Sequence, residues 1–177
     1  EDVLRLFPHC VPTGIRHGTV TVLLDGVSAE VTTYRLDGAY HDGRHPDGVR
    51  FVRSLAEDLA RRDFTINAMA MDEHGAITDL FGGGEDLPRR AIRCVGEPET
   101  RFREDALRML RAYRFAAQLG FSLDAQTQAA IRRCAPLCAS LSRERVREEA
   151  EKTLLSDRPE YFGRMLAEGL LGACIRA

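Results

Sequence analysis

The first part of the chain alternates apolar and polar positions in a way that is typical of strands. TVTVLL and AEVTTYR are two runs rich in valine and threonine, and they flank the dipeptide Asp25-Gly26. An Asp-Gly pair between two such runs predicts a tight turn, so we expect residues 20–35 to form a β-hairpin. The polar stretch LDGAYHDGRHPDG follows, and its glycines and proline predict a long loop of the kind that often carries function.

The pattern then changes to short elements. SLAEDLARRDFTINAMAMD predicts one or two short helices that lead into a strand, and AITDLF predicts a second strand. Gly82, Gly83 and Gly84 interrupt the chain after these strands. We expect this triplet to act as a hinge, because glycine is the most permissive residue for the backbone.

From about Leu87 onward, the apolar positions follow a helical repeat almost throughout. EDALRMLRAYRFAAQLG is expected to be one helix that ends at Gly120, and DAQTQAAIRRCA is expected to be a second helix behind an Asp124 cap. A third helix is expected after Ser142 and a last one near Pro159. The predicted fold class is α+β, with a sheet-containing part followed by an all-helical part.

Composition narrows the class of protein. The chain has 177 residues, of which 44% are hydrophobic, and can therefore bury a core. It has no run of eighteen apolar residues, and EDVLRLFPHC lacks the features of a secretory signal, so we expect a cytoplasmic protein outside the membrane. The five cysteines lack CxxC spacing, which argues against a disulfide framework or a zinc site. HExxH and GxSxG are absent, which leaves protease and hydrolase chemistry without support.

The basic residues are unusual in kind and in placement. The net charge of −2 makes no global case for nucleic acid, but 24 of the 25 basic residues are arginine and only Lys152 is a lysine. A guanidinium suits phosphates and base edges, although a genome rich in G and C would give the same bias without a function. Between Arg89 and Arg114, eight arginines and four acidic residues give a charge of +4, which marks a local basic region.

The segment EDALRMLRAYRF concentrates this charge. On one continuous helix, Asp105 and Arg108 would be neighbours three residues apart, and Arg111 and Arg114 would continue the same spiral stripe. The spacing alone favours a solvated face with intrahelical ion pairs, each worth a few tenths of a kcal/mol.

A functional interpretation of the same segment stays open. A carboxylate accepts hydrogen bonds and a guanidinium donates them, so Asp105 beside Arg108 would present an acceptor next to a donor. This edge would match the amino group and ring nitrogen of cytosine or adenine, and would leave buried groups unpaired against guanine or uracil. Arg111 and Arg114 could hold phosphate.

Two further places could carry chemistry. In RRDFTINAMA, Asp63 could accept from a ribose hydroxyl beside Arg62 and Asn67, but it could equally cap a short helix. In AEVTTYR, Glu30 could bind magnesium, although a single strand glutamate more often faces solvent.

Taken together, seven stretches resemble the class II bacterial tRNA nucleotidyltransferases, the family of CCA-adding enzymes and poly(A) polymerases. They follow one another as far as about Lys152, and they are PTGIRHGTVTV, AEVTTYR, YHDGRHPD, RRDFTINAMAMDEHG, DLFGGGEDL, AIRCVGEP and RFREDALRMLRAYRFAAQLGF. The resemblance implies a partial polymerase-beta-like nucleotidyltransferase head at 1–86, a helical neck at 87–152 and the start of a helical body at 153–177. It also implies addition of C, C and A to tRNA 3' ends from CTP and ATP, with Mg2+ and without a nucleic-acid template.

The resemblance also assigns roles to single residues. Asp105 and Arg108 would read the incoming base as a protein template. Arg62, Asp63 and Asn67 would contact ribose and phosphate. FGGGEDL would be the hinge between head and neck, and RERVREE would be a structural neck motif.

The loop and the metal site complete the expectation. Asp42 and Arg44 would lie in a flexible loop needed for the switch to A addition, and this RHPD-type loop favours full CCA addition. Glu30 would be a catalytic carboxylate and magnesium ligand, whereas the family's Asp-x-Asp metal pair is expected just upstream of Glu1. A lone Glu30 cannot build a two-metal clamp, so we expect the parent protein to be an enzyme and this chain alone to be inactive.

Two alternatives remain at this stage. Within the same class, the protein could be a poly(A) polymerase, or an enzyme that adds only C or only A. Outside it, the chain could be a non-catalytic module that binds nucleotide or RNA. The sequence does not predict an oligomeric state.

Overall fold

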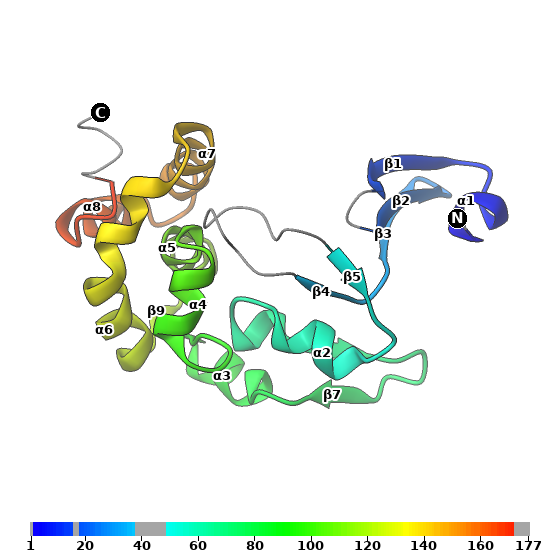
Figure 1. Cartoon of the computed structure of the whole chain (residues 1–177), viewed down its shortest axis with the longest axis horizontal. Coiled ribbons are helices and arrows are strands. Elements are labelled where there is room, and N and C mark those ends of the chain that lie inside the picture. Colours follow the sequence, from blue (N-terminus) through cyan, green and yellow to red (C-terminus); the bar gives the residue numbers. More distant parts are fainter. Residues whose placement is uncertain (1, 16–17, 38–48, 172–177) are drawn as a thin grey trace. The chain divides into compact units, whose positions relative to one another are not determined.

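A computed structural model describes residues 2–15, 18–37 and 49–171, which fall into two compact units. Unit 1 contributes the described residues up to Arg61, and unit 2 contributes those from Arg62 onward (Figure 1). Helices and small sheets are both present, so the predicted α+β class is confirmed. Within the described ranges, no helix combines the length and the apolar character that crossing a bilayer demands.

Unit 1 is built around an antiparallel three-stranded sheet of order β1-β2-β3. The predicted hairpin is confirmed, with Val22 opposite Ala29 and both Asp25 and Gly26 at positive φ, as a type I′ turn requires. A second, two-stranded sheet pairs β4 with β5. The elements of unit 1 are α1 (Asp2–Leu6), β1 (Cys10–Gly14), β2 (Thr19–Leu24), β3 (Val27–Thr32), β4 (Arg35–Asp37), β5 (Val49–Phe51) and α2 (Leu55–Ala60).

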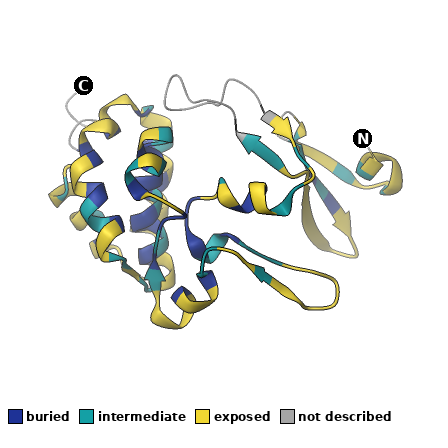
Figure 2. Cartoon of the chain, turned by 60° about the horizontal axis from the view of Figure 1, so that its bottom comes forward, coloured by how far each residue is buried: buried dark blue, intermediate teal, exposed yellow. Residues whose placement is uncertain are grey.

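Unit 2 is mainly helical and contains one helix, α5, in its core. The buried residues of α5 contact those of the surrounding helices, and Tyr113, Met109 and Leu110 are almost fully enclosed. Figure 2 shows that much of the buried part of the chain, in dark blue, lies on helices. The elements of unit 2 are η2 (Thr65–Asn67), β6 (Met69–Met71), β7 (Ile77–Asp79), α3 (Gly83–Arg89), β8 (Ala91–Ile92), α4 (Pro98–Glu104), α5 (Leu107–Leu119), β9 (Ser122–Leu123), α6 (Ala125–Cys134), η3 (Ala135–Ser140), α7 (Arg143–Leu154) and α8 (Glu160–Ala167).

The helix ends that the sequence predicts at Gly120, Asp124 and Ser142 are all observed in unit 2. Gly120 ends α5 in the left-handed conformation, and the Asp124 carboxylate accepts from the backbone N–H groups of Gln126 and Thr127 at the start of α6. Ser142 precedes α7 as predicted. The parallel pairing of β8 with β9 was not predicted, because two-residue strands leave no periodic pattern in the sequence.

The prediction of one helix through EDALRMLRAYRFAAQLG is wrong. The helix α4 ends at Glu104, Asp105 is extended with φ −146° and ψ 106°, and α5 begins at Leu107. The side chain of Asp105 explains the break, because its Oδ1 accepts from the backbone N–H of Leu107 at 3.0 Å. Asp105 and Arg108 therefore do not lie on one helical face.

The glycine triplet is held tightly within unit 2. The carboxylate of Asp79 accepts from four successive backbone N–H groups, those of Phe81, Gly82, Gly83 and Gly84, at 2.8–3.3 Å. A Cβ on Gly83 would lie 2.3 Å from the carbonyl oxygen of Thr65, so only glycine fits there. A hinge role for the triplet stays a prediction.

We expect Gly83→Ala to destabilise the fold by roughly 1–3 kcal/mol, because the added methyl group meets backbone atoms that cannot move aside. The matched control is Gly163→Ala in α8, where a Cβ would have no heavy atom within 4 Å. This control should be neutral or stabilising by up to about 1 kcal/mol, since alanine favours helix. Urea unfolding of both variants measures the difference, and equal stabilities would contradict the proposed close contact.

Asp79 should give the protein a stability increment that depends on pH. The backbone N–H of Gly84, together with those of Phe81, Gly82 and Gly83, lowers the pKa of this carboxyl group below its ordinary value. The contribution is therefore complete above the ordinary pKa and is lost as the pH falls through the lower, folded-state pKa.

The substitution Asp79→Asn tests this contribution. It replaces one carboxylate oxygen by an amide N–H2 group, which cannot accept from the backbone N–H donors. It should cost about 1 kcal/mol at pH 7 and progressively less below pH ~4. Asp72→Asn is the control. The backbone N–H groups of His74 and Ala76 both donate to Oδ1 of Asp72, and the amide oxygen of asparagine can take the place of this one atom. A penalty for Asp79→Asn that does not change with pH, in denaturation curves between pH 3 and 7, would argue against the ionised cap.

Candidate nucleotide-binding site

Asp63 is the centre of a polar cluster in unit 2. Its Oδ2 accepts from Nε of Arg111 at 2.8 Å and lies 2.7 Å from Nη2 of the same side chain. Its Oδ1 accepts from the backbone N–H of Phe64 at 2.9 Å and from Nδ2 of Asn67 at 3.2 Å. Arg62 joins the cluster by donating from Nη1 to the carbonyl oxygen of Asn67 at 3.1 Å. The structure therefore brings together four residues that the sequence analysis singled out.

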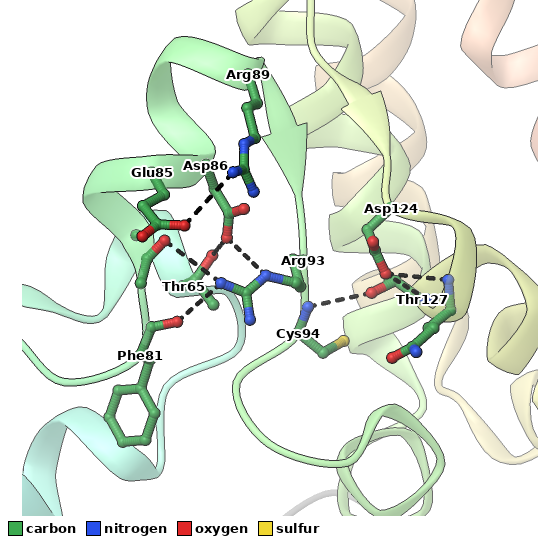
Figure 3. A network of polar contacts seen from close by, with 12 residues as sticks. Thr65, Phe81, Glu85, Asp86, Arg89, Arg93, Cys94, Asp124 and Thr127 are labelled. Atoms are coloured by element: carbon green, nitrogen blue, oxygen red, sulfur yellow. Dashed lines mark hydrogen bonds and ion pairs between the residues drawn. The ribbon is translucent and has the colours of Figure 1, made fainter.

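The segment that carries Asp63 and Asn67 is fixed from two sides. The N–H of Thr65 donates to the carbonyl oxygen of Arg93 at 2.9 Å, and the Thr65 hydroxyl donates to Oδ2 of Asp86 at 2.6 Å. Arg93 donates to the same Asp86 oxygen at 2.8 Å and to the carbonyl oxygen of Phe81 at 2.9 Å (Figure 3). This network links η2 to α3 and to Arg93, the residue that follows β8, and so supports the segment that carries Asp63 and Asn67.

The contacts of Asp63 limit the number of further donors that its carboxylate can accept from. Its side chain is 9% exposed, and the four contacts use most of the acceptor capacity of a carboxylate. The bond to Phe64 fits the local capping role that the sequence left open, and the bond to Arg111 adds a long-range ion pair. A ribose hydroxyl would have to share or replace one of these donors.

Asp105 and Arg108 are each held by a charged partner. Oδ2 of Asp105 lies 2.8 Å from Nη2 of Arg145 on α7. Arg108, which is 6% exposed, donates from Nη1 to the Glu104 carboxylate and to the carbonyl oxygen of Arg101. Both groups are therefore oriented by neighbours, as a rigid recognition edge would require.

Arg114 lies outside the Asp63 cluster. Its Nε donates to the carboxylate of Glu149 on α7, Nη1 donates to Oε1 of Gln118 at 2.8 Å, and the guanidinium lies 3.9 Å from the ring centroid of Phe115. Arg114 and Arg108 are both buried, so the expectation of a solvated arginine face is wrong. The reason is that acidic partners come from beyond α5, which no intrahelical spacing can reveal.

Of the remaining predicted site residues, Glu30 belongs to unit 1 and the other two are not described. Glu30 lies on β3 opposite Thr21 and is exposed. This agrees with the alternative interpretation, that Glu30 is a strand residue that faces solvent. Asp42 and Arg44 lie outside the described residues.

The described residues do not fit a two-metal site. Among residues 2–15, 18–37 and 49–171, no three histidine, cysteine, aspartate or glutamate side chains lie close enough together to hold a metal ion. Glu30 offers one carboxylate, whereas phosphoryl transfer by two metals needs more ligands. The magnesium role of Glu30 stays a prediction, and no step of the reaction is assigned to it.

Sequence reasoning missed the residues that support the site. Asp86 and Arg93 lie in stretches that resemble the family, but nothing in their spacing indicates that they meet. Arg145 and Glu149 in RERVREE have opposite charges and are four residues apart, so they lie on the same face of a helix. This spacing could have indicated that the face contacts charged partners on other elements. The buried thiol of Cys94 has a pKa raised to about 12 by burial, so it is no nucleophile at neutral pH.

Comparison with known proteins gives one consistent result. Residues 1–93 match the family described as "Poly A polymerase head domain", and residues 120–174 match "Probable RNA and SrmB- binding site of polymerase A". The chain is 57% identical over 154 residues to the CCA-adding enzyme of Geobacillus thermodenitrificans, covering 87% of this chain and 38% of that protein.

Solved structures agree with this match. A crystal structure of the Bacillus stearothermophilus CCA-adding enzyme in complex with CTP has 51% identity and a TM-score of 0.85, covering 96% of this chain and 41% of that one. A Thermotoga maritima CCA-adding enzyme complexed with tRNA has 27% identity and a TM-score of 0.75, covering 97% of this chain and 39% of that one. The chain thus spans about two fifths of the length of these relatives.

The buried pair of Arg114 and Glu149 should be essential for stability. Glu149→Ala leaves a buried guanidinium without its carboxylate, and we expect a loss of roughly 3–5 kcal/mol. Glu148→Ala is the matched control, because Glu148 is exposed and lies 4.0 Å from Lys152; its effect should stay within about 0.5 kcal/mol. Chemical denaturation of both variants tests the pair, and a small loss for Glu149→Ala would show that water replaces the missing acceptor.

Proposed function

Because the chain belongs to the poly(A) polymerase head-domain family, we propose that it is the nucleotide-selecting part of a template-independent tRNA nucleotidyltransferase. The proposed reaction adds C, C and A to the tRNA 3' end from CTP and ATP. The 3' hydroxyl attacks the α-phosphorus, a new P–O bond forms, the bond to the β-phosphate breaks, and pyrophosphate leaves. The chain spans two fifths of its relatives, so this activity is proposed for the protein that carries it.

One observation carries the proposal: Arg62, Asp63, Asn67 and Arg111 form a single cluster although 48 residues separate Asp63 from Arg111. A carboxylate can accept from ribose hydroxyls, and guanidinium groups bind phosphate. Asp63 would bind the ribose of the incoming nucleotide when one of its present donors moves aside. Arg62 and Arg111 would then lie beside it to hold the triphosphate.

Base selection is proposed for Asp105 and Arg108. Asp105 accepts hydrogen bonds from the backbone N–H of Leu107 and from Arg145, whereas a carboxylate offers about four acceptor positions. It can therefore still accept from the amino group of cytosine or adenine. Arg108 would donate to the adjacent ring nitrogen. Guanine and uracil would present a carbonyl oxygen to the carboxylate, which is an unpaired contact in a dry site.

The domain limits and the loop belong to the same proposal. We assign 1–86 to the head, 87–152 to the neck and 153–177 to the start of the body. Asp42 and Arg44 would act in the switch from C to A addition. Glu30 would supply one carboxylate to the Mg2+ that this family is expected to use, with the remaining ligands outside the described residues.

Incorporation of nucleotides by the full-length protein tests the activity. Labelled tRNA that lacks its CCA end should gain C, C and A with CTP, ATP and Mg2+, and nothing with UTP or GTP. Addition of A alone to a tail without C would favour a poly(A) polymerase or A-adding enzyme. No incorporation, together with retained CTP binding, would favour a non-catalytic nucleotide-binding module.

Asp105→Asn should relax base selectivity. The amide presents an N–H2 donor or a carbonyl acceptor, so we expect the preference for CTP over UTP to fall about 10- to 100-fold. Glu97→Gln is the control, since it makes the same charge change at an exposed residue before α4. Both nucleotides are measured on one enzyme preparation, so partial unfolding cancels from the ratio. An unchanged ratio would exclude Asp105 from base selection.

A further inference from the structure

A hollow lies in unit 2 at the C-terminal end of α5, and its lining includes none of Arg62, Asp63, Asn67, Asp105, Arg108 and Arg111. Its volume is about 380 Å³. Two arginines, Arg90 and Arg158, lie on its wall together with Gln118, Gly120, Phe121 and Asp157. We infer that this hollow binds a backbone phosphate of the RNA partner, with Arg90 and Arg158 as its ligands.

These two arginines differ from most of the others in unit 2 because neither has a carboxylate partner. Along the described part of the chain from residue 62, eleven arginines form ion pairs with acidic side chains, among them Arg89 with Glu85 and Arg132 with Glu168. No ion pair within that part includes Arg90 or Arg158. Two unpaired guanidinium groups on one hollow are a site for an anion.

The backbone at Arg90 fixes where its side chain begins. Arg90 follows α3 in the left-handed conformation, with φ 52° and ψ 47°, and its N–H closes the helix. Glycine takes this position without strain, whereas a residue with a Cβ costs about 1 kcal/mol. The backbone of Arg90 is fixed by these bonds and by the N–H of Ser122, which donates to its carbonyl oxygen at 2.8 Å, so the starting point of its side chain is well defined.

Arg158 is placed by the end of α5. Its Nε would lie 3.4 Å from a Cβ built on Gly120, so the guanidinium lies against the backbone of this residue. The negative end of a helix attracts a cation there, with an effective charge of about half an electron. That attraction helps to hold the Arg158 side chain beside the hollow, where Arg90 adds a second positive charge.

The charge of the hollow indicates which phosphate it takes. Arg90, Arg158 and Asp157 sum to +1, which matches the single charge of an RNA phosphodiester better than the several charges of a free triphosphate. Gln118 adds amide donors, because its Oε1 already accepts from Arg114. Phe121, Asp157 and Arg158 lie within residues 120–174, which match a probable RNA-binding region. The inference rests on the proposed function in that the partner is an RNA.

The test measures binding of labelled tRNA without its CCA end to the 177-residue chain at several salt concentrations. Arg90→Gly and Arg158→Gln should each weaken binding roughly three- to tenfold and reduce the slope of log affinity against log salt by about 0.7. Arg90→Gly should leave stability unchanged or higher, since glycine suits the left-handed position. Arg89→Gln is the control, because it removes the same charge one residue away from an arginine already paired with Glu85.

CTP affinity separates this inference from the proposed function. Both variants should keep the CTP affinity of the unaltered chain, because the hollow is not the nucleotide site. Unchanged tRNA binding in both variants, an equal loss in Arg89→Gln, or no tRNA binding by the unaltered chain would each overturn the inference. Weaker CTP binding together with weaker tRNA binding would also overturn it, because the hollow would then belong to the nucleotide site.

Discussion

A guanidinium can be buried only where an acceptor is supplied, and this constraint organises unit 2. The helix α5 carries Arg108, Arg111 and Arg114 beside its apolar core residues. Their carboxylate partners come from three different places: Glu104 at the end of α4, Asp63 before η2, and Glu149 on α7. The three ion pairs therefore bring these three segments together on α5, where Arg108 and Arg114 are buried and Arg111 is partly exposed. Removing one partner of a buried pair would be costly, because it leaves an uncompensated charge beside the core.

The same constraint links the fold to the proposed chemistry. The residues proposed to bind a nucleotide already form ion pairs or hydrogen bonds within the protein. A ribose hydroxyl would share or replace one of the present donors to Asp63, whereas Asp105 has acceptor positions left for the base. The network of Thr65, Asp86 and Arg93 lies behind these residues and holds the backbone from which Asp63 and Asn67 extend.

Local rules were enough to predict much of the fold. Asp25-Gly26 identified the hairpin, Gly120 and Asp124 marked helix ends, and the order of the motifs led to the family. They were insufficient at Asp105, where a side chain that caps the next helix interrupts an otherwise continuous helical pattern. They also could not show that Arg114 is buried, because its partner is 35 residues away in the sequence. Partners of this kind depend on tertiary contacts, which periodicity does not contain.

The two charges on one face of α7 have a consequence for how this helix docks. Arg145 meets Asp105 and Glu149 meets Arg114, one helical turn apart and with opposite signs. Sliding α7 along its own axis by a turn would bring like charges together, at a cost that a mostly charged helix cannot recover from apolar contacts. The two ion pairs of opposite sense therefore favour a single alignment of α7 against its neighbours.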